Sequence, residues 1–266
     1  MAYISPMLTN IVTAVKKASV NLNRDFSEIE RLQNSVKGSL DFTRFAFDKI
    51  QKGLKNEFAK ILPAIPCVAI SEKTPQSGMY LIISGIEGLA NFAHGNPEFA
   101  ISAALMNGQT ILCGVVYNPA RDELFFAEKG KGAFKEGFRS HERLRVASKQ
   151  DLDGALVAIK PTVNDVELSA KIINNTLAMC RDVRVSGAVA LDLAYVAAGK
   201  LDAIIAPDTM LASMAAGVLL VKEAGGMALE MEQADTRTED LPMLLNSGNL
   251  MAVSFNLSQK IAKVLK

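Results

Sequence analysis

The sequence predicts a mixed protein of the α+β or α/β class, in which helices cover β-sheets. In the first sixty residues, apolar side chains recur at helical spacing. From residue 66 onward, short apolar runs bounded by Gly, Asn or Pro replace that period, as expected for strands. In the second half, strand-like runs alternate with helix-like segments, which indicates an α/β unit with partly parallel pairing.

The composition is that of a folded chain without a bulk charge. Of the 266 residues, 49% are hydrophobic and 21% are charged, which argues against disorder and coiled coil. The formal charge is +1, so no global field or evident patch attracts nucleic acid or an anionic membrane. Three dispersed cysteines exclude a disulfide framework and favour a reducing, cytoplasmic location. The most apolar stretch, 210–221, is too short for a membrane span, which needs about 20 residues.

Helices are expected in the first sixty residues. Two apolar series recur at helical spacing, one formed by Met7, Ile11, Val12 and Val15, the other by Phe45, Ile50, Leu54 and Phe58. Between them, residues 37–42 (Lys-Gly-Ser-Leu-Asp-Phe) favour a turn over a continued helix.

Strands and helices are then expected in a regular order. The predicted strands of the first half are 67–70, 80–83, 99–105 and 110–117, and residues 117–125 predict a hairpin whose turn begins at Asn118-Pro119. In the second half, strands are predicted at 155–159, 183–185, 203–205 and 227–231, and helices at 166–179, 188–198 and 209–224. The last helix is apolar nearly all round, so we expect it to be buried.

The polar stretch 139–153 is the expected boundary between two parts. Residues 1–145 would form an α+β part with a mainly antiparallel sheet, and residues 146–266 a C-terminal α/β part.

Several segments carry recognisable motifs: 84–92 (SGIEGLANF), 211–217 (LASMAAG) with 223–226 (EAGG), the hairpin 114–134, 187–202, and 31–42. Together they resemble the signatures of the inositol monophosphatase superfamily, most closely its bacterial SuhB-type branch. The resemblance covers nearly the whole chain. It implies a layered αβαβα sandwich with an active-site-like cleft between the two parts.

The resemblance also implies a Mg²⁺-dependent phosphomonoesterase, in which a cluster of carboxylates holds the metal ions. Mg²⁺ prefers octahedral oxygen coordination at about 2.0–2.1 Å, from carboxylates and substrate phosphate. Two ions would clamp the attacking and leaving oxygens, and nearby carboxylates must offset their charge.

This chain departs from the pattern at the positions that would carry the chemistry. Relative to the family signatures, the sequence has Ser84 for the first aspartate, Gly85 for proline, Glu87 for the second aspartate, Leu89 for threonine and Ala212 for the aspartate of the second signature. Ala206 and Phe47 align with two further acids, with Asp48 one step out of register, and Lys73 replaces an acidic neighbour of Glu72. We therefore expect only Glu72 and Glu87 as metal ligands, Mg²⁺ held weakly or not required, and little or no activity.

The retained glycines suggest that the scaffold of the site survives. If helices begin near Leu89 and Ala212, as the resemblance implies, their N–H groups attract an anion such as phosphate without a metal. We assign substrate or anion binding to Gly88, Leu89, Gly187, Ala188 and Asp192, of which the resemblance places Asp192 beside a substrate hydroxyl.

Several of these residues also have a purely structural interpretation. Glu72-Lys73 could be a solvated loop pair, Glu87 a helix-start acid and Asp192 a structural cap or pairing residue. His94 is interpreted as a turn residue, because the family chemistry uses no histidine.

Three functions follow as hypotheses. The first is an inactive or weakly active SuhB-like protein that acts by binding, with RNA polymerase or its elongation factors as the partners that the resemblance implies. The second is a residual Mg²⁺-dependent phosphomonoesterase acting on inositol phosphate or a sugar phosphate. The third is a sensor of a small phosphorylated metabolite. The family resemblance also implies a homodimer.

Overall fold

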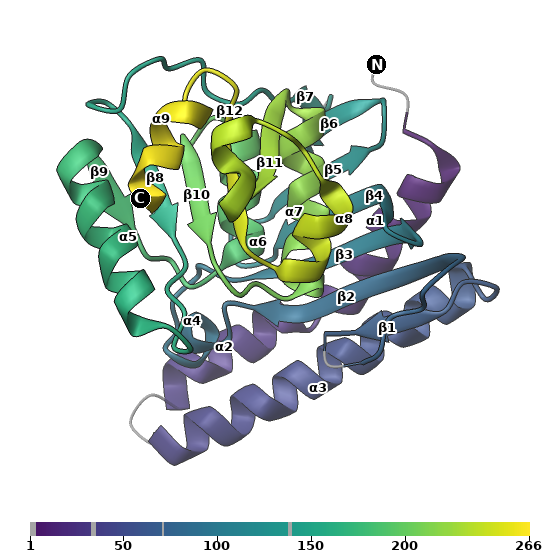
Figure 1. Ribbon diagram of the computed structural model, residues 1–266. Helices are drawn as coiled ribbons and strands as arrows, with labels where there is room; N and C mark the ends of the chain where they lie inside the picture. Colours follow the sequence, from purple (N-terminus) through teal and green to yellow (C-terminus); the bar gives the residue numbers. More distant parts are fainter. Residues whose placement is uncertain (1–3, 33–35, 71, 138–139) are drawn as a thin grey trace.

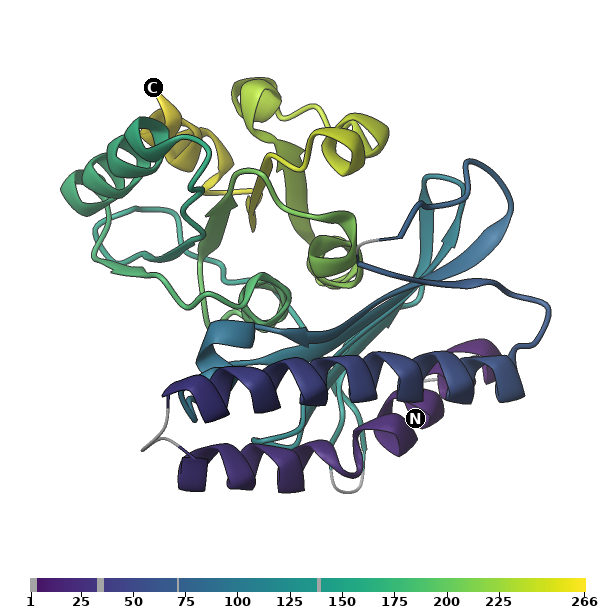
Figure 2. The same cartoon turned by 90° about the horizontal axis from the view of Figure 1, so that it is seen from below.

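The computed structural model describes residues 4–32, 36–70, 72–137 and 140–266, which stack as helices, sheet, helices, sheet and helices (Figure 1; Figure 2). Three hydrophobic clusters fill the spaces between these layers. This arrangement confirms the expected mixed fold with two sheets covered by helices.

The first layer consists of α1 (Pro6–Ser19), α2 (Leu22–Leu32) and α3 (Val36–Ile61). Helix α1 starts at Pro6, whose missing N–H costs nothing there, and the Ser5 hydroxyl accepts a hydrogen bond from the Leu8 N–H at 3.2 Å. Its buried residues Leu8, Ile11 and Val15 pack in the cluster beneath the first sheet. The expected apolar face of this helix is thereby confirmed.

The turn predicted at 37–42 is wrong, because α3 runs through this segment without a break. Phe42, Ala46, Ile50 and Leu54 continue the helical spacing into the core cluster. Their burial outweighs the cost of about 1 kcal/mol for a glycine within a helix. Of the expected apolar series, Ile50, Leu54 and Phe58 are buried as predicted, whereas the prediction for Phe45 is wrong because it is 58% exposed. Residues 33–35 of the resembling segment 31–42 lie outside the described residues.

The first sheet has the order β1-β2-β3-β4-β5-β6-β7, in which only β1 and β2 are parallel. Its strands are β1 (Cys67–Ala69), β2 (Met79–Glu87), β3 (Ala100–Asn107), β4 (Thr110–Asn118), β5 (Glu123–Glu128), β6 (Gly132–Lys135) and β7 (Glu142–Arg143). The predicted hairpin after β4 is confirmed. In its turn, Asn118 Oδ1 accepts a hydrogen bond from the Arg121 N–H at 3.1 Å.

The second sheet has the order β11-β12-β10-β8-β9. Strand β8 (Leu156–Ile159) is parallel to β9 (Asp182–Arg184) and to β10 (Ala203–Ala206), whereas β12 (Leu250–Ser254) is antiparallel to β10 and to β11 (Gly226–Glu230). The strands predicted in the second half are thus present within one or two residues of their expected bounds. The first sheet ends at Arg143 and the second begins at Leu156; Arg139 of the expected boundary segment lies outside the described residues.

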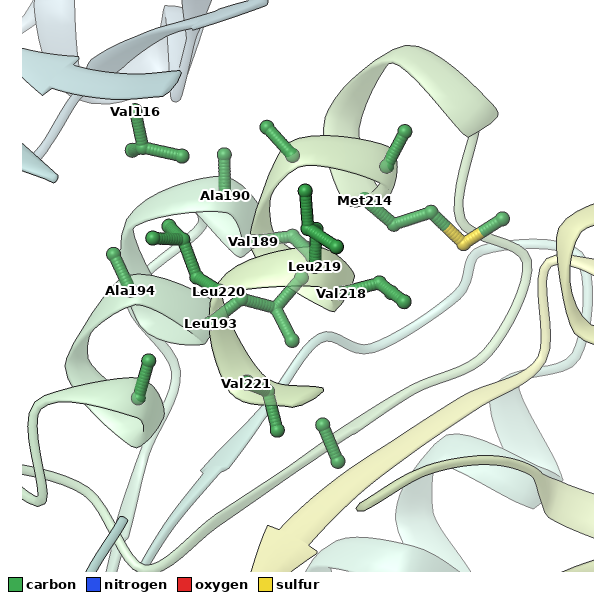
Figure 3. Packing of buried hydrophobic residues seen from close by; sticks show 14 of the residues in the cluster. Val116, Val189, Ala190, Leu193, Ala194, Met214, Val218, Leu219, Leu220 and Val221 are labelled. Atoms are coloured by element: carbon green, nitrogen blue, oxygen red, sulfur yellow. The ribbon is translucent and has the colours of Figure 1, made fainter. Parts of the chain in front are cut away.

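Helices α6 (Val189–Ala197) and α7 (Leu211–Glu223) form the central layer (Figure 3). The burial predicted for α7 is confirmed, since its residues from Ala212 to Val221 are all buried. Two glycines permit the close packing. A Cβ at Gly114 of β4 would lie 2.8 Å from the Ala216 carbonyl oxygen, and a Cβ at Gly217 would lie 2.4 Å from Leu193 Cβ.

The outer layer contains α5 (Val166–Met179), α8 (Leu241–Ser247), α9 (Ser258–Ala262) and two short 3₁₀ segments, η1 (Met231–Thr236) and η2 (Lys263–Leu265). Helix α5 begins where Asp165 Oδ1 accepts a hydrogen bond from the Leu168 N–H at 2.8 Å. Among the described residues, no helix combines the length and apolar character required to cross a bilayer.

Candidate functional site

The signature segment forms a tight corner between β2 and α4 (Leu89–Ala93). The pairing of β2 with β3 shifts register between Ser84 and Glu87, and Gly88 turns the chain with φ of +90°. A Cβ at Gly88 would lie 2.8 Å from the Glu98 carbonyl oxygen and 3.2 Å from Ala188 Cβ. Glycine is therefore required both by the backbone angle and by the close approach of the second half of the chain.

Glu87 points from this corner to the start of α6. Its Oε2 accepts a hydrogen bond from the Ala190 N–H at 3.3 Å, and the residue is 8% exposed. Burial raises the pKa of Glu87 to about 8, with nearby Asp192 acting in the same direction and the Ala190 N–H and Lys160 acting against it. Glu87 thus contacts the N-terminus of α6, a helix from the second half of the chain.

Asp192 lies in the first turn of α6 and is also buried. Its Oδ2 accepts a hydrogen bond from the Ser186 hydroxyl at 2.5 Å, and Ser186 Oγ accepts one from the Ala188 N–H at 3.0 Å. Burial raises the pKa of Asp192 to about 7, although the Ser186 hydrogen bond opposes the shift. The Ser186 side chain therefore links the start of α6 to the carboxyl group of Asp192.

The substituted signature positions have different exposures. Ser84 is 1% exposed on β2, Ala212 is 2% exposed in the first turn of α7, and Leu89 is 37% exposed at the start of α4. None of the three side chains carries a charge.

Gly187 has a φ of +78° immediately before Ala188, which precedes α6.

Glu72 lies in a different environment, on an exposed loop after β1. Its Oε1 accepts a hydrogen bond from Lys55 Nζ of α3 at 2.5 Å, and its Oε2 accepts one from the Ala69 N–H at 2.9 Å. The Lys55 hydrogen bond is the main cause that lowers the pKa of Glu72. Lys73 is exposed, and Ser71 lies outside the described residues. Glu72 is therefore occupied by protein donors at the surface, whereas Glu87 is buried.

Lys160, which follows β8, was not predicted as a site residue. Its Nζ donates hydrogen bonds to the carbonyl oxygens of Pro207 at 2.8 Å and Asp208 at 2.6 Å. Burial lowers the pKa of Lys160, while the charges of Asp208 and Glu87 oppose this shift. Its position directly after an apolar strand was the signal in the sequence that could have indicated a site residue. The strand pattern does not show which carboxyl group the lysine approaches.

Asn91, within the signature segment 84–92, joins three segments of the chain. Its Nδ2 donates hydrogen bonds to the carbonyl oxygens of Glu98 at 2.6 Å and Ser186 at 2.7 Å. The amide thereby fixes α4 against the loop that precedes α6.

The other aligned positions supply no further acid to this region. Ala206 is buried at the end of β10, Phe47 packs against the core beneath the first sheet, and Asp48 is exposed on α3. Across residues 4–32, 36–70, 72–137 and 140–266, no three His, Cys, Asp or Glu side chains gather in a group that could hold a metal ion.

Comparison with known proteins agrees with this fold. The sequence profile of the inositol monophosphatase family matches residues 4–266, and the chain belongs to this family. It is 36% identical over 234 residues to an inositol-1-monophosphatase of Rhizobium meliloti, with 86% of each chain covered. It is 30% identical to the Nus factor SuhB of Pasteurella multocida, with 97% of this chain and 95% of the relative covered.

A solved structure shares the same architecture. The extragenic suppressor protein suhB of Bartonella henselae superposes with a TM-score of 0.83 at 31% identity, with 99% of both chains covered. The resemblance inferred from the signature segments is thereby confirmed at the level of family and fold.

Proposed function

We propose that this protein is an inactive or weakly active member of its family and that it acts by binding. The observation that carries the proposal is the environment of the signature positions. Ser84, Glu87 and Ala212 are all buried, and only Glu87 among them has an acidic side chain, which contacts the N-terminus of α6.

Charge balance supports this proposal. Two Mg²⁺ ions need several carboxylates, and the two acids expected to remain, Glu72 and Glu87, are bound by Lys55 and by the Ala190 N–H. Burial also raises the pKa of Glu87, because it disfavours the charged form of the carboxyl group. The residues present do not fit a pair of magnesium ions.

A binding role needs a partner. The relative from Pasteurella multocida is named Nus factor SuhB, and by this relationship we assign RNA polymerase or its elongation factors as the partner class. In this proposal the protein works in the cytoplasm as a homodimer, with no requirement for Mg²⁺. A pull-down with tagged full-length protein against purified polymerase and elongation factors tests the assignment. If the tagged protein captures none of these components, the assignment is contradicted.

A residual Mg²⁺-dependent phosphomonoesterase is the second candidate. It is favoured by the name of the Rhizobium meliloti relative, an inositol-1-monophosphatase that is 36% identical to this chain. Under this alternative, Glu72 and Glu87 with water would complete a single metal shell, and the substrate would be inositol phosphate or a sugar phosphate.

Hydrolysis of inositol 1-phosphate during a Mg²⁺ titration separates the two candidates. We expect no turnover above the uncatalysed rate and no saturable Mg²⁺ binding by calorimetry. Brisk hydrolysis that is abolished both by a chelator and by Glu87→Gln would establish the second candidate. Glu142→Gln, an exposed acid on β7, serves as the matched control.

A further inference from the structure

The carboxyl ends of β8 and β10 lie side by side in the second sheet, because these strands are parallel neighbours with Ile159 opposite Ile205 (Figure 1). Short connections join α6 to β10 and β10 to α7, so both helices begin at this same edge. In α/β sheets, ligands bind outside the carboxyl ends of the parallel strands. We call this region, where β8 and β10 end and α6 and α7 begin, the carboxyl edge.

The carboxyl edge has the positive ends of two helices. Neither Ala188 before α6 nor Met210 before α7 caps its helix with a side chain. A helix N-terminus has a partial positive charge, which an acidic side chain offsets. The first turn of α6 contains Asp192 and contacts Glu87, whereas the first turn of α7 has no acid and buries the uncharged Ala212. The positive end of α7 is therefore not offset by an acid of its own first turn.

Lys160 brings a full positive charge to the carboxyl edge. It follows β8 directly and is half-buried. Its Nζ donates hydrogen bonds to the carbonyl oxygens of Pro207 at 2.8 Å and Asp208 at 2.6 Å, which lie between β10 and α7. The ammonium group is therefore held where both parallel strands end.

Two acids interact with this ammonium group. The charges of Asp208 and Glu87 oppose the lowering of the Lys160 pKa by burial, and Lys160 in turn acts to lower the pKa of Glu87. The Asp208 carboxylate is also bound elsewhere, since its Oδ2 accepts hydrogen bonds from Thr162 Oγ1 at 3.0 Å and from Asn164 Nδ2. Glu87 comes from the first sheet, so Lys160 and Glu87 interact across the two halves of the chain.

A lysine at this position gives a charge balance different from that of a metal site. A magnesium site offsets its divalent cations with several carboxylates. At the carboxyl edge, an ammonium group fixed by the chain already interacts with Glu87, and the start of α7 adds partial positive charge. A divalent ion entering here would meet charges of its own sign, and their repulsion is strongest where water is excluded.

We propose that Lys160 is a tethered cation, which takes the place of a metal ion at the carboxyl edge and excludes divalent ions from it. The ammonium group offsets the charge of Glu87 and holds the Pro207 and Asp208 carbonyl groups in front of α7. Lys160 is thus a positioning residue and not a catalytic one. This inference rests on the proposed metal-free function and names the residue that maintains it.

The background for the test is Ala212→Asp, which adds a carboxylate to the first turn of α7, where an acid is favourable. Full-length protein with this substitution is compared with the same protein that also has Lys160→Met. Electron paramagnetic resonance of free Mn²⁺ measures metal binding without any need for activity. We expect the double variant to bind Mn²⁺ at least about tenfold more tightly, because one repelling charge is removed. Equal affinities, or no Mn²⁺ binding by the double variant, would overturn the proposal.

Lys160→Arg separates the charge from the packing of the side chain. Arginine keeps the positive charge and several N–H donors. In the Ala212→Asp background, this variant should bind Mn²⁺ as weakly as the chain that retains Lys160. Binding as tight as that of the Lys160→Met variant would show that the charge is not the cause.

Lys171→Met is the matched control in the same background. It changes the net charge by the same amount, but Lys171 is exposed on α5 and lies away from the ends of β8 and β10 in the sequence. The Mn²⁺ affinity of this variant should equal that of Ala212→Asp alone. An increase as large as that caused by Lys160→Met would refute a specific effect of Lys160.

Lys160→Gln provides a second variant if Lys160→Met disturbs the fold. Its amide has no charge and still donates a hydrogen bond to a carbonyl oxygen. Thermal unfolding shows whether each variant is folded at the temperature of the titration. Unchanged Mn²⁺ affinity in both Lys160→Met and Lys160→Gln would refute the tethered cation.

The two proposals fail separately. Efficient Mg²⁺-dependent hydrolysis by the wild type would refute the non-catalytic function, and it would do so whatever Mn²⁺ affinities the Ala212→Asp variants have. Equal Mn²⁺ affinity with and without Lys160 would refute the tethered cation and leave the absence of hydrolysis by the wild type intact.

Discussion

Glu87 at the end of β2 accepts a hydrogen bond at 3.3 Å from the backbone N–H of Ala190 in the first turn of α6. This contact joins the first sheet to the central helix layer. It places a buried carboxyl group against the positive end of a helix.

The buried acids Glu87 and Asp192 should make the protein less stable as pH rises. Their folded-state pKa values, about 8 and about 7, lie above the ordinary values of 4.5 for glutamate and 3.8 for aspartate. At pH values between the ordinary and the folded-state pKa of each acid, the folded protein keeps a proton that the unfolded chain has released. The free energy of unfolding therefore falls as pH increases through this range. Thermal unfolding between pH 5 and 8 should show this decline.

The variant Glu87→Gln identifies the source of that decline. An amide cannot ionise, so the variant should lose stability more slowly with pH and unfold several degrees above the wild type at pH 8, given ~2–4 °C per kcal/mol. Glu142→Gln, on the exposed strand β7, should keep the wild-type slope. Parallel pH profiles for wild type and Glu87→Gln would contradict the assignment.

Gly88→Ala should be strongly destabilising. A non-glycine residue in a left-handed conformation costs about 1–2 kcal/mol. At Gly88 the new Cβ would also lie 2.8 Å from the Glu98 carbonyl oxygen. The control is Gly78→Ala, because Gly78 has a similar φ of +80° and no atom within 4 Å of its added Cβ. Urea unfolding should give a loss of about 3 kcal/mol or more for Gly88→Ala, and equal losses in both variants would rule out the close contact.

Lys160→Met should reduce stability by about 1–3 kcal/mol, because the Pro207 and Asp208 carbonyl oxygens lose a charged donor. Lys55→Met removes an ion pair with the exposed Glu72 and should cost about 1 kcal/mol or less. Chemical denaturation at pH 7 compares the two variants. A smaller effect for Lys160→Met than for Lys55→Met would show that the Lys160 hydrogen bonds contribute little.

Asn91→Ala should loosen the contact between α4 and the segment before α6. The substitution removes two hydrogen bonds from Nδ2, to the Glu98 and Ser186 carbonyl oxygens, and should cost about 1–3 kcal/mol. Hydrogen exchange should increase at residues 186–190 in particular. The exposed Asn107, at the end of β3, gives a control variant that should leave this segment unchanged.

Much of the fold follows from local patterns in the sequence. The apolar surface of 209–224 predicted a buried helix, and α7 is buried from Ala212 to Val221. The sequence alone also shows that the signature positions Ser84, Leu89 and Ala212 have no acidic side chain. The failure at 37–42 has a tertiary cause, since core packing of later residues of α3 outweighs the local preference of glycine for a turn.

The sequence by itself determined the buried helix α7, the strands β8 to β11 and the residue types at the signature positions, because spacing and residue type are local properties. The tertiary structure decided where the remaining charges lie. Glu72 meets Lys55 at the surface, Glu87 meets the start of α6 inside, and Lys160 approaches from another sheet. These are long-range contacts, and they depend on how the layers pack and which groups lose water.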